Sequence, residues 1–224
     1  MRFFYKQAPL VLATLGIAMG LTGYYLDIVL RVSFENLLWA GIVLFLGIAG
    51  FAAGRLVQRL DLSAHTDFLT GLWNRRYFYL RLAEEEVCAT RKNTQLCIAM
   101  IDIDNFKEIN DRYGHATGDM LLSDLAAMFR KSVRSIDVVT RWGGDEFAII
   151  FAGASLMEAH EIMERVRQKV EARFNSSYGL AISAGIISLE PDRELEDLLV
   201  LADRALYKAK EQKNSVITIT ERPG

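Results

Sequence analysis

Two pairs of carboxylates stand out in the chain, Asp102 with Asp104 and Asp145 with Glu146. The first pair follows an apolar run, and the second follows two glycines. Carboxylates gathered without partners repel one another, so a cation is their natural companion. Hard oxygen ligands of this kind suit Mg²⁺, which usually takes one or two carboxylates and completes its shell with phosphates and water. On spacing alone, a magnesium site and a set of solvated turn acids are equally good interpretations.

The glycines before the second pair, Gly143 and Gly144, would let the backbone approach a bulky ligand and present its N–H groups to phosphate oxygens. A Gly-Gly pair is more often simply the turn of a β-hairpin, and it gains meaning here because Asp145 and Glu146 follow it. A calcium-binding EF-hand that begins at Asp102 is excluded, since its loop would lack the required glycine and the final glutamate.

The elements that must position these residues indicate an α/β domain. Residues 96–101 are continuously apolar, as a strand covered on both faces requires, so Asp102 follows at the carboxyl end of that strand. Apolar segments on both sides of the Gly-Gly pair predict antiparallel strands at 137–142 and 146–152. The other expected elements are helices 74–93, 106–112, 117–134, 155–173 and 194–212, with strands 96–103, 179–188 and 215–220.

The N-terminal part of the chain is apolar enough to enter a membrane. Residues 7–26 and 36–54 carry no charge, and each run could cross about 30 Å of hydrocarbon as a helix. A cleaved signal peptide is the alternative for the first run, but its apolar stretch is too long and lacks a convincing cleavage site. Because Lys and Arg flank the outer ends of both runs, we expect a multi-pass protein of the inner (cytoplasmic) membrane with both termini in the cytoplasm.

We therefore expect a transmembrane hairpin at 1–54, a linker or stalk helix at 55–66 and an α/β domain at 67–224. The connection between the two apolar runs is too short for a sensor domain. Glycines in both runs have the small-xxx-small spacing that allows close helix contact, which would serve either dimerisation or packing within the hairpin. These glycines are Gly16, Gly20, Gly50 and Gly54.

Composition excludes other functions. From Gln58 onward the chain carries four more acidic than basic side chains, so it offers no basic footprint for a nucleic-acid polymer. Cys88 and Cys97 have neither metal-ligand spacing nor a disulfide framework around them, and they fit a reducing compartment. We interpret them as ordinary helix and strand residues.

Four segments, in consistent order and spacing, resemble the motifs of GGDEF-domain diguanylate cyclases. They are residues 67–76 (DFLTGLWNRR), 102–111 (DIDNFKEIND) with Gly114-His115 and Gly118-Asp119 after it, 141–147 (RWGGDEF) and 201–210 (LADRALYKAK). The resemblance covers residues 67 to about 215. It implies a nucleotidyl-cyclase-like α/β fold with a central, mostly antiparallel sheet flanked by helices. It also implies condensation of two GTP into cyclic di-GMP with release of two pyrophosphates.

The resemblance assigns roles to single residues. Asp102, the carbonyl of Ile103 and Asp145 would hold Mg²⁺, for which Mn²⁺ could substitute, and Glu146 would be a further ligand or would polarise the attacking hydroxyl. Asp102, Asp145 and Glu146 would thus be the catalytic residues. The residues implied to bind GTP are Asn105, Phe106, Lys107, Asn110, Asp119, Gly143, Gly144, Lys210 and Lys213.

Within that set, Asn110 and Asp119 would hydrogen-bond the guanine, and the others would line the phosphates. Without the family, Asn110 reads as a helix-surface amide and Asp119 as a helix cap. One segment departs from the family pattern, which usually follows the Lys210 position with Gly-Arg-Asn. This chain is one residue shorter there and has Lys213 in place of the arginine. A lysine lacks the planar bidentate fork, so weaker GTP binding would follow without loss of activity.

Arg134 and Asp137 match the family's R-x-x-D product-inhibition motif in type and in distance from Gly143. Arginine suits the guanine edges and phosphates of cyclic di-GMP. Arg165 would supply a secondary contact from a neighbouring domain. The alternative interpretation of the motif is a helix-ending arginine and a strand-starting aspartate.

Because one domain would hold one GTP, the implied reaction needs a homodimer whose domains face each other. The expected partners are GTP, cyclic di-GMP, membrane lipid and a second copy, with no nucleic-acid polymer. A receptor that binds cyclic di-GMP without turnover is the second hypothesis, and the intact carboxylates argue against it. A third is a cyclase that makes an adenine-containing dinucleotide, and the retained Asp119 favours GTP instead.

Overall fold

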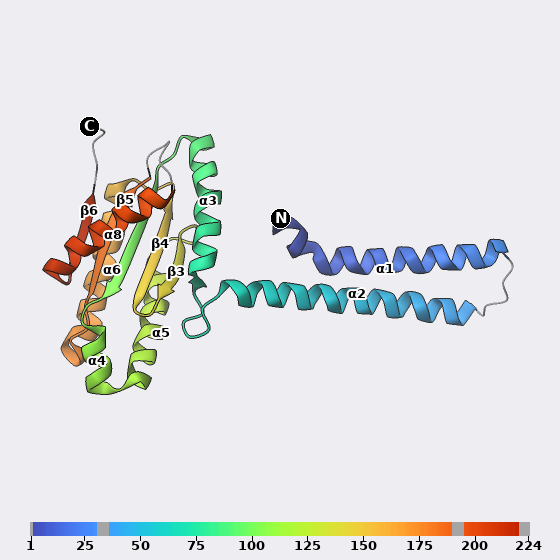
Figure 1. Cartoon of the computed structure of the whole chain (residues 1–224), viewed down its shortest axis with the longest axis horizontal. Coiled ribbons are helices and arrows are strands. Elements are labelled where there is room, and N and C mark those ends of the chain that lie inside the picture. The colour runs from blue at the N-terminus through green and yellow to red at the C-terminus, as the bar shows by residue number, and fades with distance from the viewer. Residues whose placement is uncertain (1, 31–35, 190–194, 220–224) are drawn as a thin grey trace. The chain divides into compact units, whose positions relative to one another are not determined.

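The computed structural model describes residues 2–30, 36–189 and 195–219. The chain divides into two compact units, Met1–Ala64 and His65–Gly224. The first unit holds the long helices α1 (Arg2–Leu30) and α2 (Asn36–His65) (Figure 1). The expected linker helix is continuous with the second apolar helix, because α2 runs without a break to His65.

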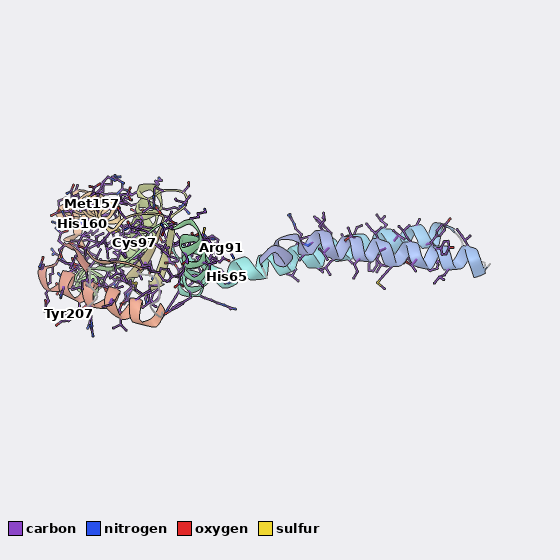
Figure 2. The ribbon with its side chains drawn as sticks, turned by 90° about the horizontal axis from the view of Figure 1, so that it is seen from above. His65, Arg91, Cys97, Met157, His160 and Tyr207 are labelled. Carbon is purple, nitrogen blue, oxygen red and sulfur yellow. The ribbon has the colours of Figure 1, made fainter. Side chains whose placement is uncertain are left out.

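Each long helix contains a 19-residue segment, Ala8–Leu26 in α1 and Leu38–Leu56 in α2, that is apolar enough to cross a membrane by length and composition. Side chains stand out along both helices (Figure 2), and large apolar ones such as Leu15 and Phe45 are mostly exposed. The hydroxyl of Thr22 donates to the carbonyl of Ala18 in the preceding turn, which satisfies that polar group without water.

The glycines of the two small-xxx-small motifs face the other helix of the hairpin. A Cβ at Gly16 would lie 2.8 Å from a backbone oxygen of α2, and one at Gly50 would lie 2.6 Å from a backbone oxygen of α1. Gly20 and Gly54 are crowded in the same way, at 2.4 and 2.0 Å from atoms of the facing helix. Of the two uses that this spacing allows, the structure therefore shows packing within the hairpin.

The described part of the second unit contains a six-stranded sheet with the order β1-β3-β4-β2-β5-β6. The central strand β2 (Leu96–Ile103) is antiparallel to both β4 (Glu146–Ala152) and β5 (Ile182–Ser188). Next to β4, β3 (Val138–Gly143) is also antiparallel. The edge strands β1 (Trp73–Asn74) and β6 (Val216–Ile219) pair in parallel. The sheet is thus mixed, with the expected antiparallel centre.

Helices cover both faces of the sheet (Figure 1). On one face lie α3 (Arg75–Lys92) and α8 (Leu195–Gln212), and on the other lie α5 (His115–Ser132) and α6 (Leu156–Val170). The short helix α4 (Phe106–Tyr113) follows β2 directly and packs on α5. Because α4 starts three residues after the end of β2, it presents its first turn at the carboxyl end of that strand.

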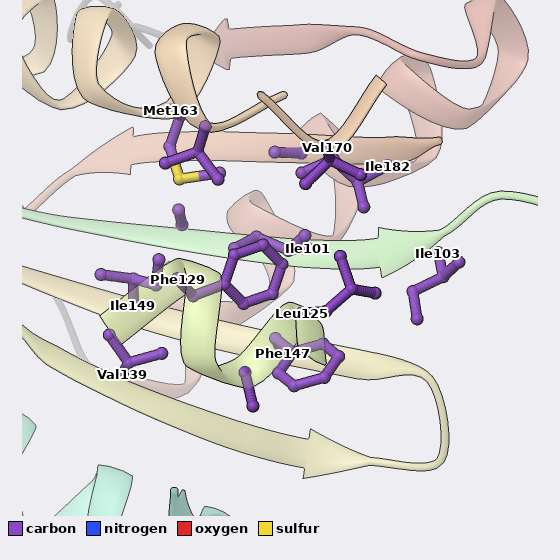
Figure 3. Packing of buried hydrophobic residues seen from close by; sticks show 14 of the residues in the cluster. Ile101, Ile103, Leu125, Phe129, Val139, Phe147, Ile149, Met163, Val170 and Ile182 are labelled. Carbon is purple, nitrogen blue, oxygen red and sulfur yellow. The ribbon is translucent and has the colours of Figure 1, made fainter. Parts of the chain in front are cut away.

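All eight residues of β2 are buried, as its continuous apolar run predicts. Alternate residues enter two separate clusters, so the strand holds both layers of helices to the sheet. In the larger cluster, Ile101 lies beside Phe129 of α5 and Phe147 of β4 (Figure 3). The rings of Phe129 and Phe147 meet edge-on with centroids 5.0 Å apart. This packing holds the carboxyl end of β2 inside the domain.

Three features differ from the expected elements. The edge strand β1 is only two residues long and carries no apolar period. The helix expected at 155–173 ends at Val170 and continues as a π-helical segment, Glu171–Asn175, and a short helix α7, Ser176–Tyr178. The strand expected at 179–188 begins at Ile182, because Gly179 first ends α7 with a φ of 67°.

The cysteines behave as expected. Cys97 is buried on β2 with its Sγ 3.3 Å from the carbonyl oxygen of Ala154 (Figure 2), and burial raises the pKa of its thiol to about 11. Cys88 is half-buried on α3, and both cysteines are free. Burial therefore makes the Cys97 thiol a poor nucleophile.

A close approach between α8 and the sheet at Gly185 generates a stability prediction. A Cβ at Gly185 of β5 would lie 2.1 Å from the backbone nitrogen of Leu206 and 2.5 Å from the carbonyl carbon of Ala205. We expect Gly185→Ala to lower the free energy of unfolding by about 2–3 kcal/mol, because α8 must move outward. Denaturant unfolding of the detergent-solubilised protein measures this. Gly143→Ala is the control, since its Cβ meets no described atom within 4 Å. Equal midpoints for the two variants would contradict the close approach.

Candidate active site

Asp102 lies next to the end of β2 and is only 4% exposed. Its neighbours across the sheet are Glu146 on β4 and Ser183 on β5. The Nζ of Lys210, from α8, lies 2.7 Å from its Oδ2. Burial raises the pKa of Asp102 to about 6, and Asp145 and Glu146 add to this while Lys210 opposes it. One lysine therefore does not fully compensate the buried negative charge.

The turn that carries Asp145 is tied to the same strand end, because the N–H of Ile103 donates to the carbonyl of Asp145 at 3.3 Å. Asp145 and Glu146 are both half-buried. Among the described residues, no three Asp, Glu, His or Cys side chains are near enough to cage a metal by themselves. Crowded carboxylates without a complete cage fit a divalent cation that keeps open positions for substrate oxygens and water.

The Gly-Gly turn is held from behind by Arg141. Its Nε and Nη2 donate to the carbonyl of Gly144 at 3.0 and 2.7 Å, and its Nη1 donates to Oδ1 of Asp67 at 3.1 Å. Asp67 in turn accepts from the N–H and hydroxyl of Thr70, which closes a tight turn before β1. Gly144 has a φ of 53°, and both glycines are exposed. Arg141 thus fixes the backbone of the turn, while both glycines stay accessible to solvent.

A second group of predicted residues meets where α4 packs on α5. A Cβ at Gly118 would lie 1.9 Å from Oδ1 of Asn110, so the glycine is required for the side chain of Asn110 to lie there. That Oδ1 is buried and has no hydrogen-bond partner in the described part of the chain. Asp119, which follows Gly118 in the chain, is exposed. A buried acceptor without a donor is costly in isolation, so this pair fits a ligand that carries N–H groups.

The residues expected along the phosphates lie on the connection between β2 and α4. Phe106 is buried in the core, so that only its backbone can serve a ligand, whereas Asn105 and Lys107 are exposed. Asn105 has a φ of 55°, and its Oδ1 accepts from the Nζ of Lys213 at 3.0 Å. Lys213 and Lys210 therefore both reach the end of β2, and both make protein contacts there.

One carboxylate does not belong to this group. The spacing groups Asp104 with Asp102, either at a cation site or among solvated turn acids, and the structure instead buries Asp104. Its Oδ1 accepts from the hydroxyl of Ser183, and its Oδ2 accepts from the N–H of Asn214, each at 2.8 Å. Ser183 is also the cross-strand neighbour of Asp102, so Asp104 lies near the same face of the sheet, but both of its carboxylate oxygens already accept hydrogen bonds.

Comparison with known proteins identifies the family to which this chain belongs. A family model described as "Diguanylate cyclase, GGDEF domain" matches residues 64–215, which is more than half of the chain. The chain belongs to the GGDEF family. The diguanylate cyclase DosC of Escherichia coli is 41% identical over 149 residues, which are 64% of this chain and 32% of DosC. The diguanylate cyclase DgcS of Shewanella oneidensis is 37% identical over 155 residues, 68% of this chain and 52% of DgcS. The chain thus spans a third to about half of these relatives.

Solved GGDEF domains share the fold. The coiled coil and GGDEF domain of DgcB from Caulobacter crescentus, solved in complex with c-di-GMP, superposes with a TM-score of 0.71 at 29% identity, over 78% of this chain and 97% of that one. The GGDEF domain of PA1120 (TpbB or YfiN) from Pseudomonas aeruginosa gives 0.64 at 38% identity, over 70% and 95%. The expected fold class and family are confirmed.

The R-x-x-D residues of this GGDEF domain contact each other. Arg134 donates to both carboxylate oxygens of Asp137, from Nε at 3.1 Å and from Nη2 at 2.7 Å. The Asp137 side chain is fully buried, while that of Arg134 is 39% exposed. Arg165 reaches the carbonyl of Ser132, at the end of the same α5 helix, at 3.4 Å. All three predicted residues therefore lie around the end of α5, and Asp137 orients the guanidinium of Arg134.

Arg141, Asp67 and Asn214 were not among the predicted site residues, although all three hold parts of the site. For Asp67 a local pattern existed, since Asp followed by Thr three residues later favours a side-chain-capped turn. For Arg141 the pattern was its position beside the Gly-Gly turn. Nothing in the sequence indicated that Arg141 and Asp67, 74 positions apart, form an ion pair.

The raised pKa of Asp102 generates a pH prediction for the metal-free protein. A carboxyl whose folded-state pKa lies above its unfolded value stabilises the fold below about pH 4, and this stability is lost as the pH rises through about 6. We expect Asp102→Asn, which mimics the protonated form, to be more stable than the parent by about 1–2 kcal/mol at pH 7.5. The difference should vanish near pH 4.

Denaturant unfolding in the presence of a chelator, repeated across this pH range, measures the effect. Asp67→Asn is the matched control with the opposite sign. Burial alone would raise the pKa of Asp67, but hydrogen bonds from Thr70 and Arg141 hold it below the usual value. Stability from Asp67 is therefore present above its unfolded pKa, and its loss should destabilise the protein at pH 7.5. A less stable Asp102→Asn protein at pH 7.5 would show that Lys210 outweighs burial.

Proposed function

We propose that this protein is a membrane-anchored diguanylate cyclase that condenses two GTP into cyclic di-GMP and releases two pyrophosphates. The observation that carries the proposal is the meeting of Asp102, Asp145 and Glu146 at the end of β2, beside an open Gly-Gly turn. Relatives that are named diguanylate cyclases support it. A carboxylate cluster next to exposed backbone N–H groups suits a nucleotide triphosphate held with a divalent cation.

Asp102, the carbonyl of Ile103 and Asp145 would hold the cation, most naturally Mg²⁺ with Mn²⁺ as a substitute. When bound, this cation supplies positive charge against the triphosphate and the charge that develops on it. The backbone of residues 105–107 and of the Gly-Gly turn would receive the phosphates, with the ammonium of Lys210 turning from Asp102 toward them. In these roles only the side chain of Lys210 would move, and the strands would keep their pairing.

In the reaction, the 3′-oxygen of each GTP forms a bond to the α-phosphorus of the other, and the bond from that phosphorus to pyrophosphate breaks. The proton leaves the hydroxyl, and Glu146, half-buried and paired across the sheet with Asp102, would accept or polarise it. Most of the rate would come from positioning and electrostatics. One domain provides one such site, so two domains must face each other in a homodimer.

Asn110 and Asp119 would select guanine. The free Oδ1 of Asn110 and the exposed carboxylate of Asp119 are acceptors, and the N1–H and N2 amine of guanine are donors. Adenine presents an acceptor at N1, which would leave these oxygens unpaired. This acceptor pair supports GTP on both sides rather than an adenine-containing product.

The hairpin α1–α2 would anchor the protein in the inner membrane with both termini and the GGDEF domain in the cytoplasm. Lys and Arg at the outer ends of the apolar segments support this orientation. The last turns of α2, which correspond to the expected linker at 55–66, would connect the anchor to the domain at 67–224. The alternative function, a cyclic di-GMP receptor without turnover, draws on the preformed Arg134–Asp137 pair.

The activity itself is the first test. Full-length protein in detergent or nanodiscs with Mg²⁺ should convert GTP, and not ATP, into a product with the mass of cyclic di-GMP. Asp145→Ala and Asp102→Ala should each lower kcat at least about 100-fold, because each removes charge that holds the triphosphate. Asp124→Ala, at a half-buried acid of α5 that pairs with Arg173, is the control and should keep full rate. Tight product binding without turnover by the parent protein would favour the receptor; a fully active Asp145→Ala protein would refute this site.

Product inhibition is a separate test. If cyclic di-GMP binds at Arg134, Arg134→Ala should raise the concentration of added product that halves the rate by at least about 10-fold, since a bidentate arginine contact contributes about 1–3 kcal/mol. The initial rate without product should stay close to that of the parent. Arg130→Ala, an exposed arginine one turn earlier on α5, is the matched control. Equal inhibition of all three proteins would leave Arg134 and Asp137 with a structural role.

A further inference from the structure

The end of β2 is tied to the turn that follows α8 by two adjacent residues. The N–H of Asn214 donates to Oδ2 of Asp104 at 2.8 Å, and the Nζ of Lys213 donates to Oδ1 of Asn105 at 3.0 Å. Both residues of the turn have positive φ, 53° at Lys213 and 45° at Asn214. Asp104 and Asn105 lie directly between the cation-facing end of β2 and the phosphate-facing start of α4.

The side chain of Asn214 points the other way and is anchored at the end of α6. Its Oδ1 accepts from Nη1 of Arg167 at 2.7 Å, and its Nδ2 donates to Oε1 of Glu171 at 2.8 Å. The same Nη1 of Arg167 also donates to Oε2 of Glu171 at 2.8 Å. The amide thus uses its acceptor and its donor on two groups that also bind each other, which fixes its orientation.

The anchor itself is rigid. Arg167 is 13% exposed and also makes a two-bond pair with Glu164, from Nε at 2.9 Å and Nη2 at 2.7 Å. These bonds, above all those to Glu164, raise the pKa of Arg167, which stays charged at any working pH. Glu171 opens the π-helical segment Glu171–Asn175, where the wider turn shifts the helix after α6.

A purely structural role for this network would stabilise the contact between α6 and the turn that follows α8. Ion pairs at a partly exposed surface contribute only about 0–1 kcal/mol, so little stability is at stake. Its far end, however, is the buried Asp104, whose two neighbours in the chain lie at the cation and phosphate positions. Displacement of a binding group by about 1 Å can weaken function by orders of magnitude while the fold persists.

We propose that Asn214, held by Arg167 and Glu171, is a positioning residue for the GTP site. It holds Asp104 through its backbone N–H and thereby fixes residues 103–107, which receive the cation and the phosphates. Asn214 touches no substrate in this role; it acts through Asp104. The inference rests on the proposed function for its substrate, but its network is independent of the reaction.

Two variants of the full-length protein break the network from opposite sides. Asn214→Gly keeps the backbone N–H and tolerates the positive φ, while it removes the amide from its anchor. Arg167→Gln removes the guanidinium. Because residues 103–107 would bind GTP equally in the ground and transition states, each variant should raise KM about 5–10-fold with kcat within about 2-fold of the parent. The double variant should be no more than about 2-fold worse than either, since both changes break the same contact.

Arg81→Gln is the matched control, because Arg81 forms the same kind of intrahelical pairs with Glu84 and Glu85 on α3. Its KM should be that of the parent. A GTP analogue with a methylene group between the α- and β-phosphates gives a second readout in the presence of Mg²⁺. The dissociation constant of this analogue should rise about 5–10-fold in both variants.

The analogue also separates this inference from the proposed function. A parent protein that binds the analogue but makes no product would defeat the cyclase assignment, and the binding arm would still test Asn214. The inference is overturned if KM and analogue affinity of Asn214→Gly and Arg167→Gln stay within 2-fold of the parent. It is also overturned if their effects multiply in the double variant, because the two residues would then act separately.

Discussion

A carboxylate at the end of a fully buried strand is the constraint on which the rest of this domain depends. The continuous apolar run of β2 places the strand in the centre of the sheet, with helices on both faces, and its last residues cannot leave that depth. Asp102 is therefore held almost out of water, where its charge is unfavourable and its pKa is raised. Lys210 offsets part of this cost, and a cation would offset the remainder. The fold thus creates a buried negative charge that Lys210 only partly compensates, and this charge would favour a bound cation.

Two segments far from β2 in the sequence are tied to this strand end. The turn after β3 is tied to it by the bond between Ile103 and Asp145, and Arg141 braces that turn against Asp67. The end of α8 is tied to it through Lys210 and Asn214. Each tie uses one charge or one backbone group rather than a large apolar area. Such contacts add little to stability but much to geometry, as a site built on positioning requires.

The sequence predicted the parts of this arrangement that local patterns determine. Strand β2 was predicted with its observed ends, because six apolar residues, Leu96 to Ile101, closed by Asp102 fit a buried strand and little else. The helices α3, α4, α5, α6 and α8 were also predicted to within a few residues, because local sequence patterns determine them too. The positions of Asp102, Asp145 and Glu146 followed from strand ends. The R-x-x-D motif could be found, but not the fact that its two side chains bind each other.

What could not be predicted depends on contacts between distant segments. Asp104 is an aspartate two residues after Asp102. Nothing in the sequence indicated that its carboxylate would accept hydrogen bonds from Ser183 and from the N–H of Asn214. The ion pair between Arg141 and Asp67 and the two-residue strand β1 are of the same kind. In the hairpin, four glycines at small-xxx-small spacing allowed two interpretations, and only the placement of both helices shows that they face each other within one chain.

The shortened segment after Lys210 shows how such contacts can absorb a change in sequence. The family pattern has a glycine there, which adopts positive φ without strain, whereas this chain reverses direction through Lys213 and Asn214, both with positive φ. Asn tolerates that conformation, but a lysine there costs roughly 1 kcal/mol. The contacts of Lys213 with Asn105 and of Asn214 with Asp104 and Arg167 offset this cost. Lys213 needs only a single bond to Asn105 in this place, which an ammonium can make as well as a guanidinium. Lys213 is thus tied to the start of α4, and as a lysine it lacks the planar fork that an arginine would offer to a phosphate.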